Sequence, residues 1–358
     1  MDVLFYTLIA TYIIALIARL TNTKSGKASI FFTFVLSAVL ILVAGLRHGI
    51  GDTVFYVHTY EMLGPGFNAQ GYEPGFLALM KFLKSISTNP QVMVFTLALI
   101  TTSLNIWTLR NYSKKNYFEL VIFMYIASGY YLVTMNALRQ ALAAAIIFSA
   151  TPLILKGKMK TYMAAIAFAT LFHNSSVIMI PVYFIARTEA WSKTIGKLLA
   201  VTLVAVALFN PIMDIVFGSL SNSKYGAYAT NNEGGANLIR IALFAVPVLF
   251  AFIKRESLKE KWPDSNIFVN ISLVCFIIMM FSAFNWAFAR FTVTLQPYSF
   301  ILLPYIIKNC LERSEKRLVY LGFLIGYLIF FYFEHGVSLG IVYRTKFTIE
   351  QLFYYVVN

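Results

Sequence analysis

Long apolar runs recur from one end of this 358-residue chain to the other, and they constrain its fold more than any other feature. A helix needs about 20 apolar residues to cross the ~30 Å hydrocarbon core of a bilayer, and most of the runs approach that length. Backbone groups in lipid must find hydrogen-bond partners within their own segment, so we expect helices. The runs cover residues 3–20, 30–46, 91–108, 118–134, 137–155, 161–186, 196–217, 237–253, 266–284, 287–307 and 317–333.

Composition agrees with a membrane protein, because charged residues make up only 12% of the chain against about 25% in soluble domains. We therefore predict an all-α polytopic membrane protein, with about 10–12 transmembrane helices in one integral-membrane domain over residues 1–358. Residues 72–86 differ from the spans, because Lys81 and Lys84 interrupt one face of an otherwise apolar helix. That pattern is typical of a helix that lies at the membrane interface.

Basic residues predict how the spans are oriented. Of the 29 Lys and Arg residues, 20 lie in six short turns, and the positive-inside rule places such turns in the cytoplasm. The turns cover residues 19–27, 110–115, 156–160, 187–197, 254–261 and 308–317. The net charge of +14 therefore belongs to membrane loops, and we expect no nucleic-acid partner.

A single crossing by residues 161–186 would force the last two basic turns to the outside. We therefore predict that this segment is a re-entrant hairpin or a pair of short tilted helices, with His173–Ser176 at a tip that faces the outer half. The outer face then holds the loops 47–90 and 218–237 and the tail 334–358.

Polar side chains on this outer face suggest a ligand with phosphate, sugar and lipid parts. Arginine pairs bidentately with phosphate oxygens, and three arginines stand where an outer loop meets a span. These are Arg47, Arg139 and Arg290. Side chains suited to a sugar or to loop contacts are Tyr56, Tyr60, Asn136, Gln140, Tyr225, Asn237 and Arg344. Candidates to orient or deprotonate a hydroxyl are Asp52 and His173, and the sequence does not choose between them.

Simpler interpretations exist for each candidate. Arg47 and Arg139 can extend to lipid headgroups, and the tyrosines suit an aromatic belt. Asp52 and Glu73 each precede a predicted helix and can cap it, while His173 can be a core histidine. The loop 218–237 can be an inert linker. No D-x-D or other metal motif is present, so we predict no metal and no cofactor.

Several segments resemble the EpsG family of exopolysaccharide polymerases, related in role to Wzy O-antigen polymerases. They occur in the same order over nearly the whole chain: "LRHGIGDTVFYVHTY", "NALRQALAAAIIFSA", "LFHNSSVIMIPVYF", "ARFTVTLQPYSFILLPYI" and "YRTKF". Each motif is short, and the ordered set is more specific than any one of them. One departure is His48, which stands where the family pattern has a hydrophobic or aromatic residue between arginine and glycine.

The resemblance implies a metal-independent, inverting glycosyltransferase of the GT-C type in the plasma membrane of a bacterium. Such an enzyme moves a glycan from undecaprenyl pyrophosphate onto the next lipid-linked repeat unit at the outer face. Its partners are the lipid-linked donor and acceptor and the bilayer, with a chain-length regulator and a flippase as further candidates. Two other classes stay open, a flippase for the same lipid-linked sugar and an O-acyltransferase that uses His173. A flippase often shows an internal repeat, and none is evident here.

Overall fold

The computed structural model describes residues 1–21, 26–64, 67, 71–114, 116–209 and 235–345. Every regular element within these ranges is a helix, which confirms the all-α polytopic class. The chain divides into two compact units. The first comprises residues 1–153, 158–177 and 312–358, and the second comprises 154–157 and 178–311. A single domain over the whole chain stays a prediction.

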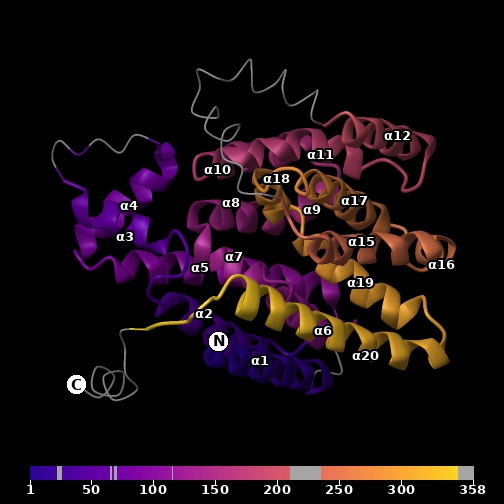
Figure 1. Cartoon of the computed structure of the whole chain (residues 1–358), viewed down its shortest axis with the longest axis horizontal. Coiled ribbons are helices and arrows are strands. Elements are labelled where there is room, and N and C mark those ends of the chain that lie inside the picture. Colours follow the sequence, from indigo (N-terminus) through magenta and orange to yellow (C-terminus); the bar gives the residue numbers. More distant parts are fainter. Residues whose placement is uncertain (22–25, 65–66, 68–70, 115, 210–234, 346–358) are drawn as a thin grey trace. The chain divides into compact units, whose positions relative to one another are not determined.

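Four apolar helices form the framework of the first unit (Figure 1). Helix α1 (Asp2–Thr21) packs on α2 (Ile30–Gly45) and on α6 (Phe118–Ala127), and α2 packs on α5 (Gln91–Ser113). Their boundaries follow the apolar runs of the sequence closely. Helix α1 turns small side chains, including Ala15 and Ala18, toward its neighbours, which lets the helix backbones approach closely.

Helix length limits how many elements can cross a bilayer by themselves. Three helices of the described chain are long and apolar enough: α1, α5 and the continuous segment Arg313–Ser338. That segment joins α20 (Arg313–Phe330) to the π-helix η3 (Phe331–Ser338). A fourth candidate is the pair formed by α6 and α7 (Tyr130–Asn136), bent by 50°. Five more apolar helices of 10–17 residues are shorter, so the total of 10–12 spans stays a prediction.

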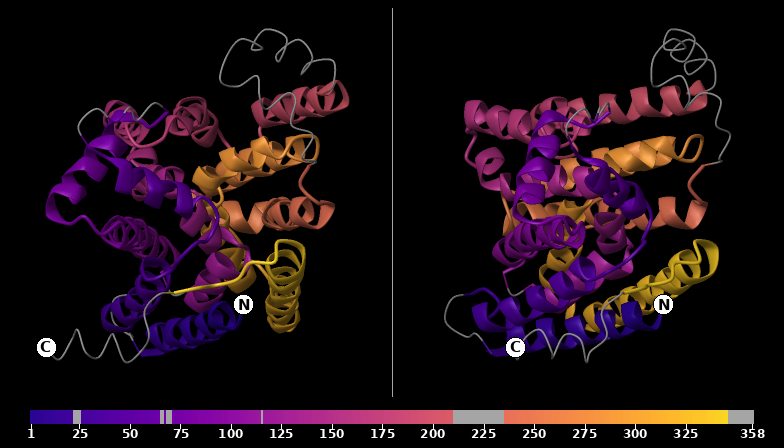
Figure 2. Two further views of the ribbon diagram at one scale, coloured as in Figure 1. Left: turned by 60° about the vertical axis from the view of Figure 1, so that its left-hand side comes forward. Right: turned by 90° about the vertical axis from the view of Figure 1, so that its left-hand side faces the viewer.

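The C-terminal helix closes one side of this unit. Helix α20 runs alongside the first unit (Figure 2) and contacts α6. The Tyr320 hydroxyl lies 2.8 Å from that of Tyr12 in α1. Further along, Phe331 packs edge-on against Phe5 of α1, with ring centroids 5.3 Å apart. These contacts hold α1 against α20 and η3, the last helices of the described residues.

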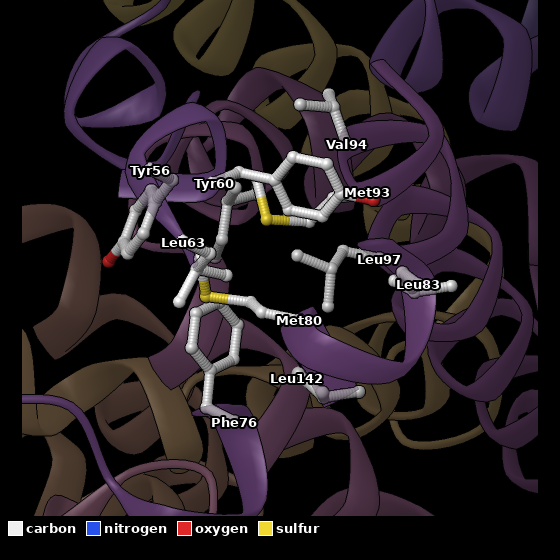
Figure 3. Packing of buried hydrophobic residues seen from close by; sticks show 11 residues of the cluster. Tyr56, Tyr60, Leu63, Phe76, Met80, Leu83, Met93, Val94, Leu97 and Leu142 are labelled. Carbon is white, nitrogen blue, oxygen red and sulfur yellow. The ribbon is translucent and has the colours of Figure 1, made fainter. Parts of the chain in front are cut away.

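Two helices of the loop 47–90 fold onto α5 and α8 (Leu138–Ser149) through an apolar cluster (Figure 3). They are α3 (Thr53–Met62) and α4 (Pro74–Ile86). Helix α4 buries Phe76, Met80 and Leu83, whereas Lys81 and Phe82 are exposed. The predicted amphipathic helix is therefore confirmed, and its position at the membrane interface stays a prediction.

The polar interruption at His173–Ser176 separates two helical pieces. Helix α10 (Met159–Thr170) ends just before it, and the 3₁₀ helix η1 (Asn174–Ile178) begins within it. Twelve residues of α-helix reach about 18 Å, less than a bilayer core. The break is confirmed, and the re-entrant course of the segment stays a prediction.

The second unit is built around α17 (Ser265–Phe281), which packs against α11, α15 and α19. Its hydrophobic cluster includes Ile195, Val248, Leu273 and Ile277. The elements of this unit are α11 (Met179–Ala186), α12 (Lys193–Ala207), α15 (Leu238–Ile253), α16 (Arg255–Lys261), α17, α18 (Ala287–Phe291), η2 (Thr292–Thr294) and α19 (Pro297–Asn309).

Candidate functional site

Predicted site residues from four elements of the first unit meet around Arg139. We define the Arg139 cluster as Asp52, Tyr56, Tyr72, Glu73, Asn136, Arg139, Gln140 and His173–Ser175. They come from the start of α3, the residues before α4, the α7–α8 junction and the break before η1. Six of these residues were predicted from the sequence, and the structure brings them together. They are Asp52, Tyr56, Asn136, Arg139, Gln140 and His173.

Arg139 is held in place by an ion pair and by aromatic rings. Its Nη1 donates to Glu73 Oε2 at 2.5 Å and to the Gly71 carbonyl oxygen at 3.0 Å. The guanidinium carbon lies 4.7 Å from the ring centroid of Tyr72 and 5.9 Å from that of Tyr56. The Arg139 side chain is 21% exposed and that of Glu73 is 8% exposed. The cation is therefore fixed at the edge of the folded unit.

Glu73 also fixes the turn that carries His173. Its Oε1 accepts from the backbone N–H of Asn174 at 3.3 Å. Next to it, the backbone N–H of Gly75 donates to the Leu171 carbonyl oxygen at 2.8 Å. A side chain at Gly75 would place its Cβ only 2.7 Å from that of Leu171, so this close approach requires glycine. One carboxylate thus joins Arg139 to the His173 turn.

His173 is oriented by a short chain of hydrogen bonds. Its Nδ1 accepts from the backbone N–H of Ser175 at 3.2 Å and lies 2.7 Å from Ser175 Oγ. The same Oγ accepts from Gln140 Nε2 at 3.3 Å. Because Gln140 follows Arg139 on α8, this helix holds both the ion pair and the imidazole ring.

Asp52 stands at the first turn of α3 but does not cap that helix with its side chain. Its backbone N–H donates to Asn136 Oδ1 at 2.7 Å. Gly51 has a φ of 52°, and a side chain there would collide with the amide of Asn136. The Asp52 carboxylate is half-buried and has no hydrogen-bond or ion-pair partner among the described residues. The capping interpretation is therefore not supported, and the carboxylate is available to a ligand.

Tyr56 is a neighbour of both Arg139 and Asp52. Burial raises the pKa of its hydroxyl, Arg139 opposes that rise, and the Asp52 carboxylate adds to it. Tyr56 is therefore close enough to both Arg139 and Asp52 to be influenced by their charges. The Tyr56 ring also packs edge-on against Tyr72 at 6.3 Å, so two aromatic rings line this part of the cluster.

Arg47 and Tyr60 have structural positions instead of the predicted ligand-facing ones. Arg47 is 1% exposed and donates to the carbonyl oxygens of Met135, at 2.6 Å, and Ala44. It therefore joins the end of α2 to α7 and does not extend to headgroups. Tyr60 is fully buried in the apolar cluster of Figure 3, and its hydroxyl donates to the Ser87 carbonyl oxygen at 2.8 Å.

Four further predicted residues are not assigned to the Arg139 cluster. Arg344 is exposed in the first unit, and its carbonyl oxygen accepts from the backbone N–H of His48 at 2.7 Å. In the second unit, Asn237 caps α15 by accepting from the backbone N–H of Arg240, and the Arg290 guanidinium lies 4.5 Å from the Trp286 ring centroid. Tyr225 lies outside the described residues.

Sequence reasoning missed Glu73 and Tyr72 as parts of the site. Glu73 was interpreted as a helix cap because it precedes Pro74, yet its side chain makes no cap hydrogen bond. A signal for both was present in the sequence: Glu73 is one of only 15 acidic residues, and it stands beside tyrosine in an outer loop. Only the fold shows that its partner is Arg139.

Comparison with known proteins gives one match. The model of the EpsG family, a family of exopolysaccharide and Wzy-like polymerases, matches residues 29–343, which is most of the chain. Neither the curated proteins nor the solved structures contain a match. The matched region includes every residue of the Arg139 cluster.

Proposed function

Since the chain belongs to the EpsG family, we propose that it polymerises a lipid-linked glycan. The donor is a glycan on undecaprenyl pyrophosphate, and the acceptor is the next lipid-linked repeat unit. The reaction takes place at the outer face of the plasma membrane, where the orientation predicted from the basic turns places the Arg139 cluster. The family supports a polymerase-type glycosyltransferase, and the GT-C class, inversion and metal independence are parts of the proposal.

The fixed guanidinium of Arg139 is the observation that carries this proposal. Glu73 and Gly71 engage its Nη1, and the side chain stays 21% exposed. The exposed part of the guanidinium carries N–H donors, so a ligand oxygen can accept from it while Glu73 holds the group in place. Oxygens of a pyrophosphate suit such a donor because charge-assisted hydrogen bonds are the strong ones.

The same geometry favours the reaction step. Negative charge on the pyrophosphate increases as the glycosidic bond breaks, so a preoriented cation stabilises the transition state more than the ground state. Tyr56 and Tyr72 offer flat apolar faces beside Arg139 for a sugar ring. Four other residues stay candidates for further contacts with the donor or acceptor: Arg290, Asn237, Tyr225 and Arg344.

A polymerisation assay tests the proposal. The protein is purified in detergent and given the lipid-linked oligosaccharide, and products are resolved by length. We expect a ladder of longer glycans that persists in excess chelator. Arg139→Ala should reduce the rate by about 100-fold or more, as for the loss of one transition-state donor. The exposed Lys81→Ala on α4 is the matched control and should leave the ladder intact. A normal ladder from Arg139→Ala contradicts the pyrophosphate contact, and a strict Mg²⁺ requirement contradicts metal independence.

A further inference from the structure

The hydrogen bonds around His173 identify which of its ring nitrogens carries the proton. A backbone N–H can only donate, so the contact from Ser175 makes Nδ1 an acceptor. The hydroxyl of Ser175 can donate to the same atom while its oxygen accepts from Gln140. The neutral ring therefore carries its proton on Nε2. In this state Nε2 donates a hydrogen bond and has no lone pair with which to remove a proton from a sugar hydroxyl.

The other candidate base, Asp52, carries a group that accepts hydrogen bonds instead of donating them. Its carboxylate only accepts hydrogen bonds when ionised, and no described residue donates to it. Its backbone is fixed through Asn136, so the side chain starts from a defined position beside α3. An ionised carboxylate with this freedom is suited to accept a proton from a bound hydroxyl.

Contacts within the first unit link the two groups to Arg139 through different residues. Tyr56 contacts the guanidinium and is influenced by the charge of Asp52. Glu73 bridges the guanidinium to the backbone of Asn174, next to His173. The His173 turn is therefore joined to Arg139 by hydrogen bonds through one carboxylate, whereas Asp52 is related to it only through Tyr56.

We infer that Asp52 is the general base and that His173 is a hydrogen-bond donor to the leaving pyrophosphate through Nε2. The inference rests on the proposed function and assigns roles within it. The acceptor hydroxyl oxygen forms a bond with the anomeric carbon and gives its proton to the Asp52 carboxylate. The bond from that carbon to the pyrophosphate oxygen breaks, and its electron pair leaves with undecaprenyl pyrophosphate. Asp52 then returns the proton to water.

Azide distinguishes the two roles, because this anion is a nucleophile that carries no proton and needs no base. Purified Asp52→Ala and His173→Ala are incubated with the lipid-linked donor, with and without sodium azide. Release of undecaprenyl pyrophosphate and formation of the glycosyl azide are measured. We expect Asp52→Ala to lose about 100-fold or more of its polymerisation rate and to regain donor cleavage with azide. His173→Ala should lose a similar factor, and azide should not restore it, because its defect lies at the leaving group.

Two amides at residue 173 give a second, independent test. The side-chain NH₂ of His173→Gln reaches the position of Nε2 and can replace its donor, whereas that of His173→Asn reaches only the position of Nδ1. We expect His173→Gln to retain activity within about tenfold and His173→Asn to resemble His173→Ala, since only the former keeps the donor. Each variant must elute as a single species in detergent and keep the melting temperature of the unsubstituted protein.

The assignment is overturned if azide revives His173→Ala, if azide fails to revive Asp52→Ala, or if His173→Gln is as inactive as His173→Ala. The unsubstituted protein separates this failure from that of the proposed function. A normal ladder with the wrong rescue pattern refutes only the roles of Asp52 and His173. The absence of a ladder from the unsubstituted protein refutes the polymerase proposal itself.

Discussion

Glu73 shows how one acidic side chain can organise a cationic site. One oxygen holds Arg139 and the other holds the backbone of Asn174, so the carboxylate fixes Arg139 relative to the turn that carries His173. The ion pair is largely buried, and removal of one partner leaves the other charge uncompensated. Glu73 is therefore a positioning residue that need not touch the substrate.

Substitution of Glu73 should affect turnover more than binding. Glu73→Gln keeps an acceptor for Arg139 but loses the charge, and we expect kcat to fall by about 10-fold with little change in KM. Glu73→Ala frees both Arg139 and the His173 turn, and a displacement of about 1 Å can cost about 100-fold in rate. Steady-state kinetics with the lipid-linked donor measure both parameters. The exposed Glu61→Gln on α3 serves as a matched control, and a rise in KM alone would contradict the positioning role.

Arg139 and Arg47 differ in role although both are arginines at helix ends. The sequence could not separate them, because burial of Arg47 depends on the Met135 carbonyl oxygen, which is far away along the chain. Asp52, His173 and Arg139 were predictable because polar side chains are rare in such a chain. Their relation through Glu73 was not, because it depends on how α4, α8 and η1 pack.

A conservative replacement should show whether activity depends on the positive charge of Arg139 or on the shape of its guanidinium group. Arg139→Lys keeps the positive charge but has no planar fork, so it cannot hold Glu73, Gly71 and a ligand oxygen in the same way. We expect activity between that of Arg139→Ala and the unsubstituted protein. The ladder assay measures it, and full activity of Arg139→Lys would show that charge alone suffices.

At the scale of elements, hydropathy predicted the helices well where one apolar run forms one helix. The boundaries of α1 and α2 follow the runs 3–20 and 30–46, because the apolar transfer energy is a local property of the segment. Run 118–134 instead contains α6 and α7, which are separated by Ser128 and Gly129. A hydropathy profile does not predict this break, because the break depends on the left-handed backbone conformation of Gly129 and on its contact with η3.

That break gives a matched pair of glycines for a stability test. Gly129 has a φ of 83°, and a side chain there would collide with the His335 ring, whereas Gly326 lies inside α20 with open space around it. We expect Gly129→Ala to destabilise the fold by about 1–3 kcal/mol or more. Gly326→Ala should be neutral or stabilise it by up to about 1 kcal/mol. Thermal melting in detergent compares them, and equal melting temperatures would contradict the role given to Gly129.

At the scale of the whole molecule, the predicted orientation puts all the chemistry on one side of the bilayer. The basic turns and the Arg139 cluster then lie on opposite faces. This arrangement is required of an enzyme that meets its lipid-linked substrates only at the outer face. It depends on the course of residues 161–186, which the positive-inside rule predicts to be re-entrant.

Cysteine labelling in intact cells tests this orientation. His58→Cys lies exposed on α3 and should react with a membrane-impermeant maleimide added from outside. Lys158→Cys is exposed in a basic turn and should react only after permeabilisation. The native Cys275 and Cys310 are both buried, which keeps the background low. Labelling of residue 158 in intact cells, or protection of residue 58, would contradict an outer-face active site.

The bridge between Arg47 and Thr345 has a consequence for biosynthesis. The backbone of residues 47–48 pairs with 344–345, and Thr345 Oγ1 donates to the Leu46 carbonyl oxygen at 2.8 Å. Thr345 lies 299 residues after Leu46, so the second half of this contact is synthesised long after the first. The loop before Asp52 therefore gains this support only once residues 344–345 have been made, which links its final packing to a late stage of chain synthesis.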